Sequence, residues 1–158
     1  MTIAHQLYLA TEEPAEQIAA RVSRLYREKG LSEEPPALGE LLDVSGAATA
    51  RGTRIHVSAP SGYPVDIVDR EFGVPSKIEL WIEPARYEPP GPQEEDIIAL
   101  VLGLLAELPV DAVLTYNYET VWLLRRGEDL VLHEDPLMWP EHWRAMIDGP
   151  YRRESLRF

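Results

Sequence analysis

The stretch that decides the fold is Asp111–Leu132, DAVLTYNYETVWLLRRGEDLVL. It holds three short apolar runs, 112–116, 120–124 and 129–133, and polar or glycine-containing tripeptides at 117–119 and 126–128 separate them. Runs of this kind, rich in branched and aromatic residues and joined by tight turns, are typical of antiparallel hairpins. The segment therefore predicts a C-terminal three-stranded meander.

Upstream of the meander lies the most apolar segment of the chain, Ile97–Leu108. Its apolar side chains would cover nearly the whole circumference of a helix, so we expect this helix to be the most buried element. Gly91 as the cap and Pro92 at the first helical position mark its start, and Pro109 marks its end.

Two strands and a second helix are predicted further upstream. Apolar and polar residues alternate in 3–9 and in 76–83, which is the pattern of a strand with one face on a core. Trp81 falls on the opposite face, under a covering segment or open to a partner. Helical spacing predicts a helix from an N-cap at Thr11 to Lys29. The irregular order of elements favours an α+β fold, with an antiparallel or mixed sheet and two main helices packed on one face.

The composition indicates a single domain spanning 1–158, with a flexible tail at 145–158. The chain has 45% apolar and 27% charged residues, which is typical of a globular protein. A chain of about 150 residues buries enough surface to form a core without disulfides or a structural metal. It contains no cysteine, which excludes disulfides, thiolate metal sites and cysteine nucleophiles.

The charge balance argues against nucleic acids and anionic membranes as partners. Fifteen basic and 27 acidic residues give a formal net charge of −12, which repels nucleic acids and anionic membranes. The 12-residue apolar segment 97–108 is too short to cross a bilayer. The first ten residues have neither the basic region nor the apolar block of a signal peptide. We therefore expect a cytoplasmic protein.

Residue types with catalytic chemistry form no recognisable pattern. The four histidines have no metal-ligand spacing, and no phosphate-binding loop or nucleophile motif is present, so we predict no metal site, no cofactor and no enzyme activity. The alternative function is a small hydrolase, in which His133, Glu134 and Asp135 would converge in a cleft. A further alternative is a peptide-binding or self-associating module that uses a strand edge.

A candidate binding site emerges once the carboxylates at predicted helix starts are set aside. The acidic residues left over flank the last predicted strand, close in sequence to a tryptophan: Glu128, Asp129, Glu134, Asp135 and Trp139. Acidic side chains would attract a basic partner, and tryptophan is common at interface hot spots. These five residues are the predicted docking site.

Two passages resemble a known family. Residues 70–82, REFGVPSKIELWI, and the meander 111–132 are similar to the immunity proteins of the myxobacterial Sit system, the partners of swarming-inhibition toxins. The resemblance implies a protein that neutralises a cognate bacterial toxin by direct binding, and it brings no catalytic residues with it. One difference is the first turn of the meander, where Asn117–Tyr118 replaces the family's Asn-Gly.

Overall fold

The protein is built on one eight-stranded sheet, seen here in a computed structural model that describes residues 3–60, 62 and 64–157. The strand order is β2-β3-β4-β1-β5-β6-β7-β8. The strands are β1 (His5–Leu9), β2 (Ala47–Ala48), β3 (Arg54–Ser58), β4 (Ile78–Glu83), β5 (Ala112–Tyr116), β6 (Thr120–Arg126), β7 (Asp129–His133) and β8 (Arg152–Glu154). The helices are α1 (Ala15–Glu28), α2 (Leu38–Leu42), α3 (Val65–Phe72), α4 (Pro90–Glu107) and α5 (Glu141–Arg144).

The first strand of the chain occupies the middle of the sheet. β1 pairs antiparallel with β4 on one side and with β5 on the other, and β5, β6 and β7 form the predicted meander. β7 and β8 are parallel, which makes the sheet mixed. The predicted α+β class and the sheet type are therefore confirmed.

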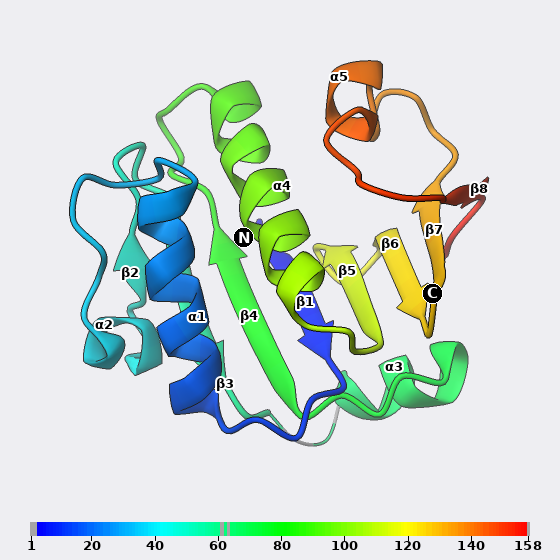
Figure 1. Cartoon of the computed structure of the whole chain (residues 1–158), viewed down its shortest axis with the longest axis horizontal. Helices are drawn as coiled ribbons and strands as arrows, with labels where there is room; N and C mark the ends of the chain where they lie inside the picture. Colours follow the sequence, from blue (N-terminus) through cyan, green and yellow to red (C-terminus); the bar gives the residue numbers. More distant parts are fainter. Residues whose placement is uncertain (1–2, 61, 63, 158) are drawn as a thin grey trace.

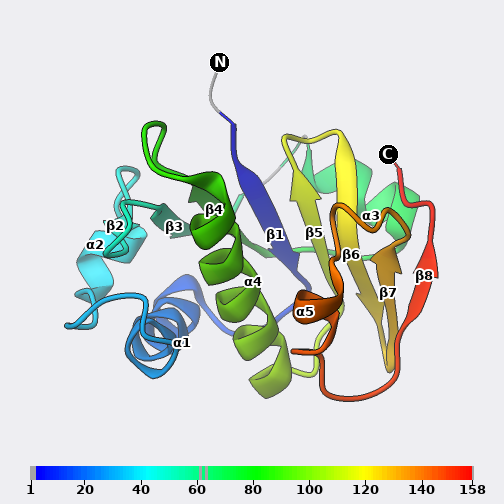
Figure 2. The same cartoon turned by 90° about the horizontal axis from the view of Figure 1, so that it is seen from above.

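The two long helices cover one face of this sheet. Figures 1 and 2 show α1 and α4 side by side over β4 and β1, while α3 lies against the other face, behind β5–β7. Alternation along β1 explains the two layers, because Leu7 and Leu9 join the larger core beneath α1 and α4, whereas Tyr8 joins a smaller core with Val68 and Phe72 of α3. Both predicted main helices lie on the predicted single face.

Helix starts differ from the predictions where prolines crowd the sequence. The helix predicted from Thr11 begins at Ala15, and the Thr11 hydroxyl instead accepts the Glu13 N–H at 3.1 Å. α4 begins at Pro90, before Gly91, because proline supplies the helical φ and needs no N–H partner in the first turn. Among the described residues, no helix is long and apolar enough to span a membrane.

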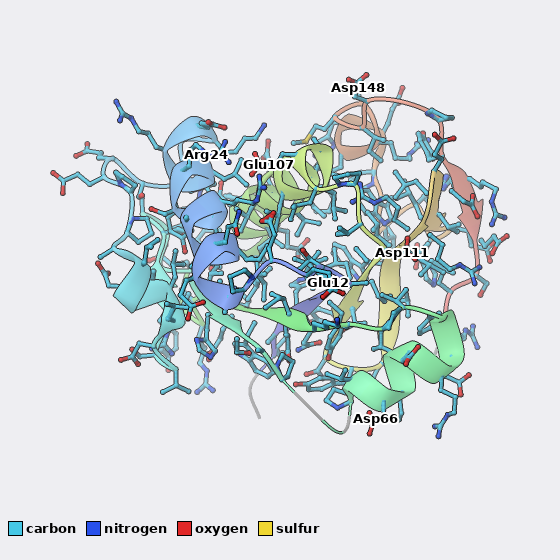
Figure 3. The ribbon with its side chains drawn as sticks, turned by 60° about the horizontal axis from the view of Figure 1, so that its bottom comes forward. Glu12, Arg24, Asp66, Glu107, Asp111 and Asp148 are labelled. Carbon is cyan, nitrogen blue, oxygen red and sulfur yellow. The ribbon has the colours of Figure 1, made fainter. Side chains whose placement is uncertain are left out.

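Ion pairs and the half-buried Arg125 hold α4 in place at its C-terminal end. Glu107 accepts bonds from Arg21 at 3.3 Å and from Arg24 at 2.6 Å, both on α1, and Figure 3 shows Arg24 beside Glu107. On the sheet side, the half-buried Arg125 of β6 donates to the carbonyls of Leu105, Leu108 and Val110. Because the last carbonyls of a helix lack intrahelical partners, Arg125 acts as the C-terminal cap of α4.

An extra residue in β6 sends a tryptophan into the main core. Leu114 pairs with Leu123 and Thr115 pairs with Val121, so Trp122 is the unpaired residue of a β-bulge. The bulge lets Trp122 and Leu123 both join the core under α4, although neighbouring residues of a regular strand point to opposite faces.

The C-terminal segment, predicted as a flexible tail over 145–158, contains a strand and buried contacts within the described residues 145–157. Residues 152–154 form β8, Leu156 is buried beside the α3 core, and Thr120 bridges to Arg157. Arg152 also forms a two-pronged ion pair with Asp129, with both bonds at 2.8 Å. The segment is held by its strand pairing with β7, by these charge pairs, and by the apolar side chains of Ile147, Tyr151 and Leu156; Phe158 lies outside the described residues.

Candidate functional site

The predicted acidic residues lie at the two ends of β7. Glu128 and Asp129 stand at the β6–β7 turn, and Glu134 and Asp135 follow the other end of this five-residue strand. At about 3.3 Å per residue the two pairs are separated by roughly 16 Å along the strand. The fold therefore places them along one edge of the molecule and does not gather them into one cluster.

Two of the four carboxylates already have partners within the protein. Asp129 is paired with Arg152, and the Asp135 carboxylate accepts the Leu137 N–H at 2.9 Å in the turn after β7. Glu128 and Glu134 are exposed and have no ion-pair partner among the described residues. They are the acidic groups that a basic partner can reach without breaking an internal contact.

Trp139 is not available as an aromatic anchor, which corrects that part of the predicted docking site. Its side chain is fully buried, and its indole Nε1–H donates to the Trp122 carbonyl at 2.7 Å. The β6 bulge creates this pocket, because it brings Trp122 onto the helical face, where its ring lies 6.4 Å from that of Trp139. Trp139 is a core residue.

The proposed hydrolase residues do not form a cleft. The Nδ1 atom of His133 accepts the Asp135 N–H at 3.0 Å, a local contact at the end of β7, and Glu134 is exposed. None of the three lines either of the two cavities described in this structure. Within residues 3–60, 62 and 64–157, no group of three or more His, Asp or Glu side chains is placed to hold a metal ion.

A cavity of about 590 Å³ lies elsewhere, at the N-terminal end of α4. It opens where α4 begins beside the ends of β1, β4 and β5, at the upper end of the sheet in Figure 1. This volume lies within the range of small-ligand pockets. Its walls come from five separate segments: Ile3 and His5, Gly52 and Arg54, residues 83–88, residues 90–94, and Tyr116.

One side chain of α4 fixes the cavity wall formed by residues 84–89. The Gln93 amide oxygen accepts the Ala85 N–H at 2.6 Å and the Thr53 hydroxyl at 2.8 Å, while its NH₂ group donates to the carbonyls of Ala85, Glu88 and Pro89. Gly52, at φ +92, lies so close that a Cβ there would be 3.0 Å from that of Ala85. The loop is therefore held in place before anything binds.

The buried wall of the cavity carries a histidine without a hydrogen-bond partner. His5 is 2% exposed, and its Nδ1 has no partner among the described residues. The rings of Tyr116 and Trp122 lie 4.9 and 4.8 Å from its own. Burial lowers the pKa of His5 to about 4, so the imidazole is neutral near pH 7 and one of its nitrogens is an acceptor.

Carboxylates outnumber cations around this cavity. Glu83, Glu88 and Glu94 line it together with Arg54 and Arg86. Arg54 lies 3.6 Å from Glu83, and Arg86 is exposed at the rim. Glu94 is half-buried and has no ion-pair partner among the described residues, and desolvation raises its pKa. The cavity lining thus includes both a partly dehydrated carboxylate and a neutral imidazole.

The sequence contains one weak signal for this cavity. His5 occupies an inward position of the predicted first strand, between Ile3 and Leu7, where an apolar residue is the usual occupant. The predictions treated it as one of four scattered histidines. Nothing in the sequence indicates that residues 52, 86, 93 and 116 would meet around it, because strand pairing and the entry to α4 determine that arrangement.

Comparison with known families then identifies the chain. A family model described as SitI3-like matches residues 3–143, most of the chain. This protein belongs to the SitI3-like family. Searches of curated proteins and of solved structures found no match.

Family membership confirms the resemblance to Sit immunity proteins and indicates an immunity-type protein. The matched region of this SitI3-like protein includes every residue that lines the cavity and both ends of β7, but not β8.

Trp81, the residue predicted to face away from the main core, is half-buried, and its ring lies 5.9 Å from the ring of Tyr118. The β5–β6 turn is therefore a covering segment for Trp81.

Tyr118 takes up an unusual backbone conformation to reach that position. Asn117 and Tyr118 have φ values of 53° and 60°, as the two central residues of a type I′ turn require. The turn thus holds a bulky residue at positive φ, where the resemblance noted from the sequence implied glycine, at a cost of about 1–2 kcal/mol.

Proposed function

We propose that this protein is a cytoplasmic immunity protein that neutralises a cognate bacterial toxin by binding it directly. The match to the SitI3-like family over residues 3–143 is the observation that carries the proposal. The protein acts by occluding a toxin domain, as one partner in a toxin–immunity pair used in bacterial competition, and catalyses no reaction of its own.

We expect the toxin domain to be basic, because this protein is strongly acidic. A net charge of −12 on 158 residues attracts a cationic protein over long distances and accelerates encounter. In the predicted docking site, Glu128 and Glu134 are the accessible carboxylates, because Asp129 is paired with Arg152 and Asp135 accepts the Leu137 N–H. They guide the first contact.

Co-expression with the toxin encoded beside this gene tests the function. We expect cells to survive and a complex to be recovered at low ionic strength. If the cells die and no complex is recovered at any salt concentration, the immunity proposal is wrong.

Association kinetics with the toxin test the predicted docking site separately from the immunity function. Glu128→Lys with Glu134→Lys is expected to lower the association rate constant on the order of tenfold at low salt and much less at high salt. The control is Glu33→Lys with Glu34→Lys, which makes the same change in net charge at two exposed residues of the α1–α2 connection. Equal slowing by both pairs would mean that net charge, and not this site, attracts the toxin.

A further inference from the structure

The cavity at the start of α4 is built as a binding site that its own residues leave unfilled. His5 is almost fully buried, yet its Nδ1 lacks a partner among the described residues. A buried polar atom without a hydrogen bond destabilises the folded state, and such atoms are rare in native proteins. Nδ1 has almost no accessible surface of its own, so it is the rest of the imidazole that lines the cavity and can meet an entering group.

The charges around the cavity select the kind of group that fits. Glu94 is partly removed from water and unpaired among the described residues, and carboxylates exceed arginines in the lining. Arg54 is already beside Glu83. A cation therefore gains an unpaired carboxylate in Glu94, whereas an anion would meet three carboxylates against two arginines, one of which is already beside Glu83.

We propose that this cavity binds an arginine side chain of the toxin. A guanidinium has five N–H donors in a planar fork, so it can donate both to the Glu94 carboxylate and to an imidazole nitrogen of His5. The half-buried ring of Tyr116 provides an aromatic surface on which such a group stacks.

The rim of the cavity has the features of an interface. Arg86 lines the cavity, is exposed and has no ion-pair partner among the described residues, and the next residue in the chain, Tyr87, is 93% exposed. Tyrosine and arginine are enriched among interface hot spots. Because Gln93 holds the loop between them and α4, binding here orders little additional chain.

This inference deepens the proposed function and rests on it, but a small probe can test the cavity without the toxin. N-acetylarginine methylamide is titrated into the intact, isotopically labelled protein and followed by NMR. We expect saturable shifts at His5, Tyr116 and the start of α4, with a Kd of the order of 1 mM, as for a fragment-sized ligand. The neutral isostere N-acetylcitrulline methylamide and the anion N-acetylaspartate are expected to cause no saturable shift.

Matched variants separate binding from folding. Glu94→Gln is expected to weaken the probe at least about fivefold, while Glu95→Gln, on the exposed side of the same helical turn, leaves its Kd unchanged. His5→Phe keeps an aromatic ring in place and removes both nitrogens. It is expected to weaken the probe while the protein stays as resistant to urea as the unaltered chain, because no internal hydrogen bond of Nδ1 is lost.

Several results would overturn the arginine site. They are the absence of saturable shifts, equal binding of the citrulline analogue, preferential binding of N-acetylaspartate, or equal effects of Glu94→Gln and Glu95→Gln. A toxin complex that forms normally with His5→Phe and Glu94→Gln would refute the site while leaving the immunity function intact. Probe binding without any toxin complex would refute the function instead.

Discussion

Two buried titratable residues give the stability of this protein opposite dependences on pH. Burial lowers the pKa of His5 to about 4 and raises the pKa of Glu79 to about 7. For His5 the unfolded chain binds the proton first, so the free energy of unfolding falls as pH decreases from 6.5 towards 4. For Glu79 the folded chain keeps the proton longer, so the free energy of unfolding falls as pH rises from 4.5 to 7.

Replacing Glu79 by glutamine tests the second dependence. Glutamine resembles the protonated acid, so Glu79→Gln should remove the loss of stability above pH 4.5. We expect the variant to be more stable than the unaltered protein at pH 8 by up to about 3 kcal/mol, since each pKa unit corresponds to about 1.4 kcal/mol. The difference should shrink towards zero below pH 4.5.

Urea denaturation at several pH values is the measurement. Glu95→Gln is the control for losing one charge at an exposed site. A Glu79→Gln variant that is less stable than the unaltered chain at pH 8 would show that the carboxylate form is the stabilising one.

At the scale of elements, the C-terminal end of α4 depends on a strand residue. Arg125 reaches across from β6 to three carbonyls that end the helix and begin the link to β5. The sequence places Arg125 and Arg126 side by side before a glycine turn, and only the alternation along β6 gives them different surroundings, half-buried for Arg125 and exposed for Arg126.

Replacement of Arg125 should therefore lower the free energy of unfolding clearly, and replacement of Arg126 should lower it only slightly. Arg125→Met keeps a long apolar stem but leaves the three carbonyls without this donor, so we expect a loss of about 2–3 kcal/mol in the free energy of unfolding. Arg126→Met removes one long contact, 3.4 Å to the Phe72 carbonyl, and should cost under about 0.5 kcal/mol. Similar losses in the two variants, measured by chemical denaturation, would refute the capping role.

The last strand has a protective role that a truncation can reveal. Ending the chain after Pro150 removes β8 and Leu156, and it exposes the outer edge of β7. We expect a loss of about 2 kcal/mol or more from the missing apolar burial, together with self-association through the freed edge. Thermal unfolding and sedimentation velocity measure the two effects, and a shortened protein that remains monomeric and equally stable would contradict the expectation.

Sequence patterns predicted these elements unevenly, for physical reasons. The strand at 76–83 was predicted because one-sided burial leaves a period of two in the sequence, and the helix at 97–108 because a long apolar run between two prolines indicates a buried helix. Residues 152–154, Arg-Arg-Glu, carry no such period, so β8 was missed. Trp139 was misplaced because a bulge in β6 creates its pocket, and the cavity was missed because five separate segments form it.

At the scale of the whole molecule, the sheet offers little edge to other chains. β2 has two residues and β8 has three, and these are the outermost strands. Apart from residues 56–58 of β3, which β2 does not pair with, these short edges expose few unpaired backbone groups, so strand addition has little edge to use. The two surfaces proposed above for a partner, the rim of the cavity and the carboxylates beside β7, do not use a strand edge.

The central position of β1 also determines how soon a newly made molecule can complete its sheet. β1 is synthesised first, but it pairs with β4 and with β5, and β5 ends about 100 residues later in the chain. At roughly 5 to 20 residues per second, ribosomes need on the order of 5 to 20 s between these strands. Until then the middle of the sheet does not exist and the cavity beside His5 is unformed. Under the proposed function, a molecule still being synthesised cannot yet bind a toxin, so protection depends on molecules completed beforehand.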